Sequence, residues 1–193
     1  IRQARKEDAQ GRVYHDFIGQ IDFIRAKALF AIDILAGMPH LTDTQIIHLH
    51  KAKHPLLYLK FQNLKKEVQP LELELNRQQR ILIISGPNAG GKSVCLKTIG
   101  LLQYMLQCGL LVPADETSEM GVFNDFFIDM GDEQSIENDL STYSSHLRNL
   151  KVMLEKLNER SLFLIDEFGS GTEPTLGAAM AEAVLEKFYD SKS

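Results

Sequence analysis

The sequence Arg80-Ile-Leu-Ile-Ile-Ser-Gly86-Pro-Asn-Ala-Gly-Gly-Lys92-Ser93 decides which kind of fold this chain adopts. Gly86 is separated by four residues from Gly91-Lys92-Ser93, which is the spacing of a Walker A phosphate-binding loop. An aliphatic run precedes the loop and a helical pattern follows it, so the context is that of a strand, a loop and a helix. We therefore predict a buried strand before Gly86, a loop that binds a nucleoside triphosphate, and a helix from Lys92 to about Gln107.

The residue types of the loop suit phosphate chemistry. Glycines let the backbone N–H groups turn inward, and together with the helix N-terminus they form a site for an anion. The Lys92 ammonium can reach the β- and γ-phosphates, and the Ser93 hydroxyl is short enough to bind Mg²⁺. The residues that we expect to contact the nucleotide are Gly86, Pro87, Asn88, Ala89, Gly90, Gly91, Lys92, Ser93 and Val94.

A second apolar run, Ser161-Leu-Phe-Leu-Ile-Asp166-Glu167, ends in two adjacent carboxylates. This is the pattern of a Walker B strand, in which Asp166 is placed to hold Mg²⁺ and Glu167 to polarise the attacking water. Adjacent Asp and Glu favour an ATPase of the ABC and recombinase-like division. The predicted fold class is α/β, with a mainly parallel P-loop NTPase sheet, flanking helices and an antiparallel edge.

Between the two Walker elements, a polar segment opens a helix at Ser141-Thr-Tyr143. A helix cap is the simpler interpretation, although a hydroxyl beside free N–H groups also suits a second phosphate clamp. After Glu167, the turn Gly169-Ser-Gly171 leads to Pro174 at the start of another helix, and its glycines predict a close approach of two backbones.

Composition sets broad limits on function. The chain has 193 residues, is 44% hydrophobic and carries a net charge of −5, so one or two globular domains are expected and a nucleic-acid partner is neither required nor excluded. No apolar run reaches the length of a membrane span and no signal peptide is visible, which favours a cytoplasmic protein without a membrane partner. Cys95 and Cys108 are predicted to be reduced thiols.

Other segments predict the organisation of the chain. Apolar residues from about 10 to 35 recur at alternating steps of three and four, which predicts a long helix with a heptad-like seam that ends near Gly37. Residues 44–75 are expected to form short strands and turns that build the antiparallel edge. Further strands are predicted at 110–113, 122–123 and 126–129. We divide the chain into a helical connector, 1–39, and a P-loop ATPase domain, 40–193.

Three histidines, His48, His50 and His54, raise the question of a metal site. No acidic or thiol partner stands near them in the sequence, so solvated or hydrogen-bonded side chains are the preferred interpretation.

Taken together, several motifs resemble the ATPase domain of the MutS family. They are His54-Pro55, Gly86-Pro-Asn-Ala-Gly-Gly-Lys-Ser93, Val112-Pro-Ala114, Ser141-Thr-Tyr143 and Asp166-Glu-Phe-Gly-Ser-Gly-Thr172. Within the family, Gly131-Asp-Glu-Gln-Ser-Ile-Glu137 is similar to the type-two bacterial branch. The mismatch-recognising branch usually has Gly-Arg before the signature serine, where this chain has Asp139 and Leu140.

The resemblance implies ATP and Mg²⁺ as cofactors, with Ser93 and Asp166 as metal ligands and Lys92 and Glu167 as catalytic residues. It also implies a head-to-head homodimer in which Ser141 acts in trans, at the ATP site of the partner, and a cycle that moves DNA held by regions outside this chain. The family carries a Thr-His switch on a strand beyond the helix that ends near Tyr189. Because that strand is missing here, we expect weak nucleotide binding and poor hydrolysis from these residues alone.

Other functions stay open at this point. A nucleotide-gated factor that binds the ribosome is one alternative, and the mismatch-recognising branch is another. A transporter ATPase is disfavoured because the Leu-Ser-Gly-Gly-Gln signature is missing. The preference for ATP over GTP follows from the resemblance alone.

Overall fold

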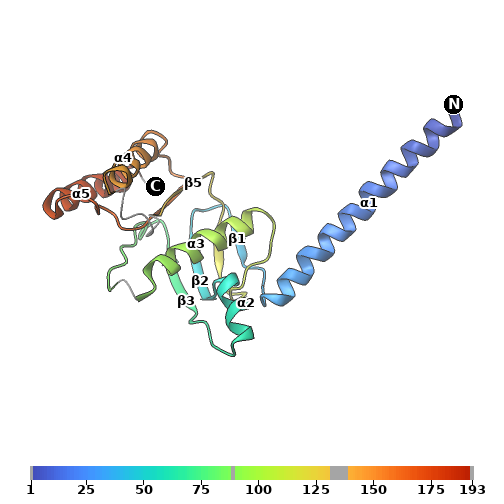
Figure 1. Cartoon of the computed structure of the whole chain (residues 1–193), viewed down its shortest axis with the longest axis horizontal. Helices are drawn as coiled ribbons and strands as arrows, with labels where there is room; N and C mark the ends of the chain where they lie inside the picture. The colour runs from blue at the N-terminus through green and yellow to red at the C-terminus, as the bar shows by residue number, and fades with distance from the viewer. Residues whose placement is uncertain (1, 88–89, 131–138, 192–193) are drawn as a thin grey trace.

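The computed structural model describes residues 2–87, 90–130 and 139–191, and it shows a mixed α/β protein (Figure 1). The helices are α1 (Arg2–Asp33), α2 (Pro55–Asn63), α3 (Lys92–Gln107), α4 (Asp139–Glu155) and α5 (Pro174–Asp190). The strands are β1 (His40–Thr42), β2 (Ile47–Ala52), β3 (Leu71–Leu75), β4 (Glu119–Gly121), β5 (Asp125–Asp129) and β6 (Ser161–Ile165).

The described strands form two sheets. The first has the order β1-β4-β2-β3, in which β1 and β4 are parallel while β2 runs antiparallel to both β4 and β3. The second is the parallel pair β5-β6. The predicted antiparallel edge is confirmed by β3, whose alternating Leu and Glu residues pair with β2. The prediction of one mainly parallel sheet is wrong for the described residues, because the larger sheet is mixed.

The segment before the phosphate loop differs most from expectation. Residues 80–85 are not assigned to a strand, and Leu82 and Ile83 are 48% and 71% exposed. Among the described residues, none pairs its backbone with 81–85. A strand requires hydrogen bonds to a neighbour as well as an apolar composition, and β6 makes its bonds to β5. The prediction of a buried strand here is therefore wrong.

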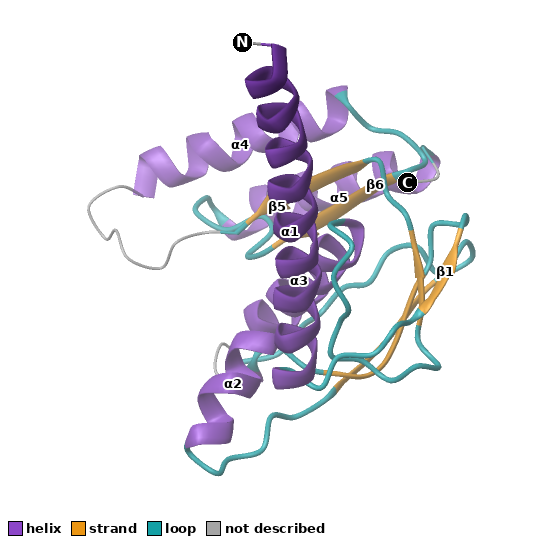
Figure 2. Ribbon diagram, turned by 90° about the vertical axis from the view of Figure 1, so that its right-hand side faces the viewer, coloured by secondary structure: helices purple, strands orange, loops and turns teal. Residues whose placement is uncertain are grey.

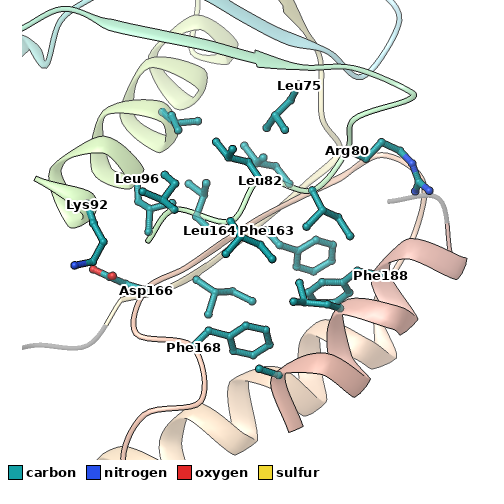
Figure 3. A pocket seen from close by; sticks show the side chains of 18 of the residues that line it. Leu75, Arg80, Leu82, Lys92, Leu96, Phe163, Leu164, Asp166, Phe168 and Phe188 are labelled. Carbon is teal, nitrogen blue, oxygen red and sulfur yellow. The ribbon is translucent and has the colours of Figure 1, made fainter. Parts of the chain in front are cut away.

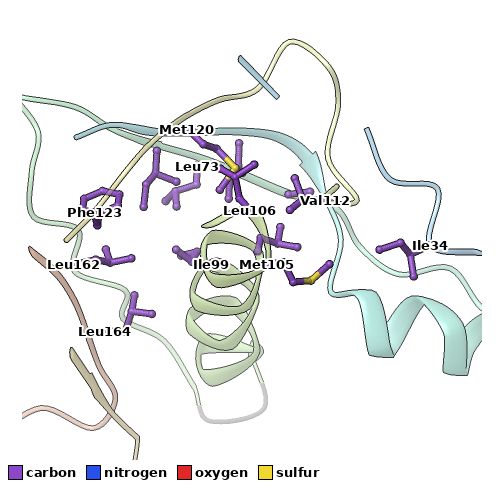
Figure 4. Close-up of a cluster of buried hydrophobic side chains, with 14 residues drawn as sticks. Ile34, Leu73, Ile99, Met105, Leu106, Val112, Met120, Phe123, Leu162 and Leu164 are labelled. Carbon is purple, nitrogen blue, oxygen red and sulfur yellow. The ribbon is translucent and has the colours of Figure 1, made fainter. Parts of the chain in front are cut away.

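The main core lies between α3 and the four-stranded sheet (Figure 4). Ile99, Leu102 and Leu106 lie on the buried face of α3, as their spacing predicts, and contact the cluster that includes Leu49 and Met120. The predicted bounds of α3 are confirmed, and the chain leaves the helix through Gly109 with a φ of 72°.

The same helix also contacts the second sheet. Leu162 and Leu164 of β6 belong to the core of α3. A Cβ at Gly100 would lie 2.6 Å from Leu164 Cδ1, so the absence of a side chain lets helix and strand approach closely. Helix α3, which begins at the phosphate loop, is thereby packed against the strand that ends at Asp166.

A second core holds α4 and α5 against β5-β6 (Figure 2). Leu150 and Met153 of α4 pack with Val184 and Phe188 of α5. The ring of Phe163 on β6 stacks on Phe127 and on Phe188, with centroids 4.9 and 4.5 Å apart. These contacts fix both helices relative to the Walker B strand.

Helix α1 extends away from the rest of the molecule (Figure 1). The long helix is confirmed, but the side chains of its seam, such as Phe17 and Ile24, are 58% and 65% exposed. Among the residues of this region whose burial the structure describes, the buried hydrophobic ones are Ala31, near the end of the helix, and Ile34, just after it. None of the described helices carries an apolar stretch sufficient to cross a membrane.

Three local predictions need correction. Residues 55–63, expected in strands and turns, form α2, which Pro55 begins because its fixed φ suits the first turn of a helix. Residues 110–113 do not form a strand, since Val112 makes only an isolated bridge to Gly37. The strand expected at 122–123 lies slightly earlier, as β4, whereas β5 confirms the strand expected at 126–129.

Candidate nucleotide site

The phosphate loop leads directly into α3. Gly86 and Gly91 have φ values of 147° and 82°, and no atom of the described residues lies within 4 Å of a Cβ built on either one. Gly91 is the N-cap of α3 and provides no side-chain cap, and the amides of the first turn of a helix suit an anion. The Lys92 ammonium donates a hydrogen bond of 2.6 Å to the Gly86 carbonyl across the loop. Asn88 and Ala89 lie outside the described residues.

The second half of the site follows β6. The backbone N–H of Asp166 donates to the Asp129 carbonyl at 2.8 Å, which continues the bonding between β5 and β6 by one residue. The N–H of Glu167 donates to Asp166 Oδ1 at 3.1 Å. Glu167 has a φ of 52°, in the left-handed region that costs a residue with a side chain about 1 kcal/mol or more. Strain of this kind is often found at functional sites.

One pocket of about 1400 Å³ brings the two Walker elements together. Gly86, Lys92, Ser93, Asp166 and Glu167 all line it. Figure 3 shows the side chains of Lys92 and Asp166 directed toward each other from the start of α3 and the end of β6.

Other predicted contacts are placed nearby. Pro87, Gly90, Gly91 and Val94 belong to the loop and to the first turn of α3 but are not lining residues of the pocket. The remainder of the pocket has both apolar and polar lining residues, and residues 81–85 and β6 supply much of its apolar part.

The donor set fits a magnesium-bound triphosphate. A hydroxyl and a carboxylate, from Ser93 and Asp166, are the hard oxygen ligands that Mg²⁺ prefers. The Lys92 ammonium and the open amides supply positive charge and hydrogen-bond donors for phosphate oxygens. The two positive-φ glycines leave the space that these oxygens need.

Ser141 lies in the first turn of α4, and its side chain is outside what the structure describes. The loop before it, 131–138, also lies outside the described residues. The structure therefore places the signature at a helix N-terminus, as predicted, and gives no contact for its hydroxyl.

Sequence reasoning missed the residues that attach α4 to β5, the strand that pairs with the Walker B strand β6. Asp129 is 5% exposed, and its carboxylate accepts hydrogen bonds from His146 at 2.7 Å and Asn149 at 2.8 Å. The available signal was a carboxylate at the end of an apolar strand together with a His and an Asn three residues apart on one helical face.

The turn after Glu167 confirms the predicted approach of two backbones. Gly169 and Gly171 have φ values of 80° and 77°. A Cβ on Gly177 of α5 would lie 2.1 Å from the Gly169 carbonyl oxygen, so neither backbone leaves room for a side chain. Glu173 then caps α5 by accepting hydrogen bonds from the N–H groups of Thr175 and Leu176.

The histidines take structural contacts. His50 Nδ1 lies 2.9 Å from Glu72 Oε2, and its ring is 4.2 Å from that of His48. The expectation of a hydrogen-bonded side chain is confirmed for His50, whereas the expectation that no acidic partner stands nearby is wrong, because strand pairing brings Glu72 to it. Burial, followed by the charge of Lys97, lowers the pKa of His54.

The cysteines are both free thiols. Burial raises the pKa of Cys95 and so disfavours the thiolate, despite its place in the first turn of α3.

Comparison with known proteins agrees with the motifs. Residues 82–193 match MutS domain V. The chain is 49% identical over 174 residues to the protein named Endonuclease MutS2 of Shouchella clausii, which covers 90% of this chain and 21% of that protein. It is 44% identical over 178 residues to Endonuclease MutS2 of Carboxydothermus hydrogenoformans, covering 92% and 22%. The chain thus spans about a fifth of the length of these relatives. It belongs to the MutS family and is similar over most of its length to the type-two branch.

Proposed function

We propose that residues 40–193 form the ATP-binding and ATP-hydrolysing domain of a MutS-type DNA-processing protein, with residues 1–39 as its helical connector. The observation that carries the proposal is the single pocket lined by Lys92, Ser93, Asp166 and Glu167. These four residues come from two segments far apart in the sequence. Their meeting in one pocket is typical of a site that binds and hydrolyses a nucleotide.

Each residue has a separate role in the proposed reaction. Lys92 neutralises charge on the β- and γ-phosphates, and Ser93 and Asp166 hold Mg²⁺, directly or through water. Bound Mg²⁺ supplies Lewis-acid stabilisation of the transferring phosphoryl group. Glu167 accepts a proton from the attacking water, and its strained backbone, at the end of β6, aims the carboxylate independently of Asp166. The ABC-like assignment rests on this Asp-Glu pair.

We further propose a composite site in a homodimer, in which Ser141 of one protomer meets the nucleotide of the other. Ser141 lies in the first turn of α4, whereas Lys92 begins α3, so the two side chains come from different helices. The resemblance to the MutS family supports a site completed in trans.

The target of the ATP cycle is proposed to be DNA. The relatives are named endonucleases, which ascribes cleavage within a nucleic-acid chain to those proteins. We propose that the domain described here supplies the nucleotide-driven movement, that α1 conveys it, and that DNA is contacted outside these residues. The choice between DNA and the ribosome is tested with the protein that the complete gene encodes, called here the gene-encoded protein. Its binding to branched DNA is compared with its co-sedimentation with ribosomes over a salt series.

The substitution Glu167→Gln in the gene-encoded protein tests the ATPase proposal. The variant should bind ATP and form the nucleotide-dependent dimer, but turnover should fall by about 100-fold or more because the general base is lost. Glu182→Gln, the same chemical change at an exposed position of α5, is the control and should retain turnover. Wild-type turnover in Glu167→Gln would remove Glu167 from the mechanism.

A further inference from the structure

Asp129 is the last residue of β5 and carries a buried carboxylate. It is 5% exposed, and two side chains of α4, His146 and Asn149, donate to its two oxygens. An ionised carboxylate only accepts hydrogen bonds, so His146 Nδ1 carries the hydrogen. A buried carboxylate is costly without such partners, so these bonds hold the helix to the strand end.

The backbone of Asp129 makes a second connection. Its carbonyl accepts the N–H of Asp166 at 2.8 Å, immediately after β6 ends. One residue therefore contacts the Walker B aspartate through its main chain and α4 through its side chain. Among the described residues, Asp129 thus connects the backbone of Asp166 directly to α4.

The position of these bonds along α4 determines which part of the helix they hold. Among the side chains of α4 that the structure describes, the buried apolar ones, Leu150 and Met153, lie in the second half of the helix. His146 lies closer to the signature than either of them, about 8 Å from Ser141 along the helix axis at 1.5 Å per residue. A helix held only at its apolar contacts can pivot about them, and the bonds to Asp129 fix the orientation of its N-terminal turns.

We propose that Asp129, with His146 and Asn149, is a positioning cluster that sets the place of the Ser141 end of α4 according to the geometry at Asp166. The inference rests on the proposed function, because it assigns the cluster to the site that Ser141 completes in the partner protomer. We assign the three residues a positioning role, since none of them lines the pocket that holds Lys92, Ser93 and Asp166. They act by orienting α4.

Two variants of His146 in the gene-encoded protein test the cluster. His146→Leu removes the donor, whereas His146→Asn keeps an N–H donor near the place of Nδ1. We expect His146→Leu to lower kcat for ATP hydrolysis by about ten-fold or more, because small misplacements of a catalytic group have effects of that size. It should weaken ATP-dependent dimerisation and leave the affinity of a separate protomer for a fluorescent ATP analogue unchanged. His146→Asn should recover part of the lost kcat.

Asp125→Asn is the matched control. Asp125 starts β5 and accepts a hydrogen bond from Asn158 at 2.8 Å, so the substitution disturbs an Asp–Asn pair at the other end of the same strand. It should leave kcat and dimerisation unchanged. Asp129→Asn is a further variant that changes the buried carboxylate itself. If that variant fails to fold, the comparison of His146→Leu with His146→Asn still tests the proposal.

The outcomes separate the proposals. The positioning cluster is supported if His146→Leu lowers kcat, His146→Asn recovers part of that kcat, and Asp125→Asn keeps the wild-type kcat. The proposal is overturned if a folded His146→Leu protein keeps its kcat and its dimerisation. It is also overturned if His146→Leu, His146→Asn and Asp125→Asn lose kcat equally. Absence of Glu167-dependent hydrolysis in the wild-type protein instead overturns the proposed function and, with it, this inference.

Discussion

Asp166 and Glu167 are adjacent in the chain but differ in their backbone conformations, and this difference suits two roles. Asp166 is bonded to β5 through its N–H, in continuation of the sheet. Glu167 turns into the left-handed region, with a φ of 52°, and begins the glycine turn. A metal ligand benefits from a rigid strand end, while a general base must face water on the other side of the phosphate. The local backbone therefore separates two carboxylates that the sequence places side by side.

The tight contact between Gly169 and Gly177 makes the turn after Glu167 sensitive to one methyl group. In Gly177→Ala the new Cβ would lie 2.1 Å from the Gly169 carbonyl oxygen, so the turn or α5 must shift. We expect a loss of about 1–3 kcal/mol in the free energy of unfolding, as for other overpacked sites, measured by urea denaturation.

The control for this change is Gly19→Ala on α1, where nothing lies within 4 Å of the added Cβ. That substitution should raise stability slightly, because alanine has the higher helix propensity. Equal stabilities of Gly177→Ala and the wild type would show that the backbones separate at little cost.

At the scale of elements, the sequence predicts those whose signals are local. The bounds of α3 follow from Gly91, Gly109 and an apolar face between them, and β6 follows from an apolar run with a carboxylate end. Residues 81–85 have an equally apolar pattern but form no strand. A strand needs a neighbouring strand to pair with, and the composition of a segment does not reveal whether one is present. The attachment of α4 to Asp129 is missed for the same reason, since the sheet brings these residues together.

The cap of α5 gives a prediction about pH. Hydrogen bonds from the N–H groups of Thr175 and then Leu176 lower the pKa of Glu173 below its ordinary value of 4.5. Because the folded pKa is lower than the unfolded one, the carboxylate contributes stability above pH 4.5, and this contribution is lost as the pH falls through the folded pKa.

Comparison of the wild type with Glu173→Gln measures the contribution of the carboxylate. The wild type should have the higher urea midpoint at pH 7, since a charged acceptor suits a helix N-terminus, and the difference should shrink under acid. Other carboxylates titrate in both proteins and cancel. A difference that stays constant from pH 7 to well below 4.5 would contradict the cap.

At the scale of the molecule, two cores meet at β6, and the long helix α1 reaches the first core near its C-terminal end, where Phe30 packs against it. Leu162 and Leu164 belong to the core of α3, whereas Phe163, on the opposite face of the strand, belongs to the core of α4 and α5. The Walker B strand therefore joins the helix that begins at the phosphate loop to α4, the helix that carries Ser141 in its first turn. The exposed apolar seam of α1 forms part of neither core. This arrangement suits a domain whose nucleotide site is coupled to surfaces beyond it.

Mixing two inactive variants of the gene-encoded protein tests whether the ATP site is shared between protomers. Lys92→Ala removes the ammonium from the phosphate loop, and Ser141→Ala removes the signature hydroxyl, so each homodimer should be nearly inactive. In a mixed dimer one site combines both defects, while the other combines the intact Lys92 of one protomer with the intact Ser141 of its partner.

Random exchange of protomers makes half of the dimers mixed, with one intact site of two, so the mixture should regain about a quarter of wild-type kcat. Such recovery requires that the hydroxyl act across the interface, because a site built within one protomer gains nothing from mixing. Lys92→Ala mixed with Glu167→Gln is the control, since both residues line the same pocket and every dimer would keep a defect in each site. If the mixture of Lys92→Ala and Ser141→Ala regains no more kcat than that control, the Ser141 hydroxyl acts at the ATP site of its own protomer.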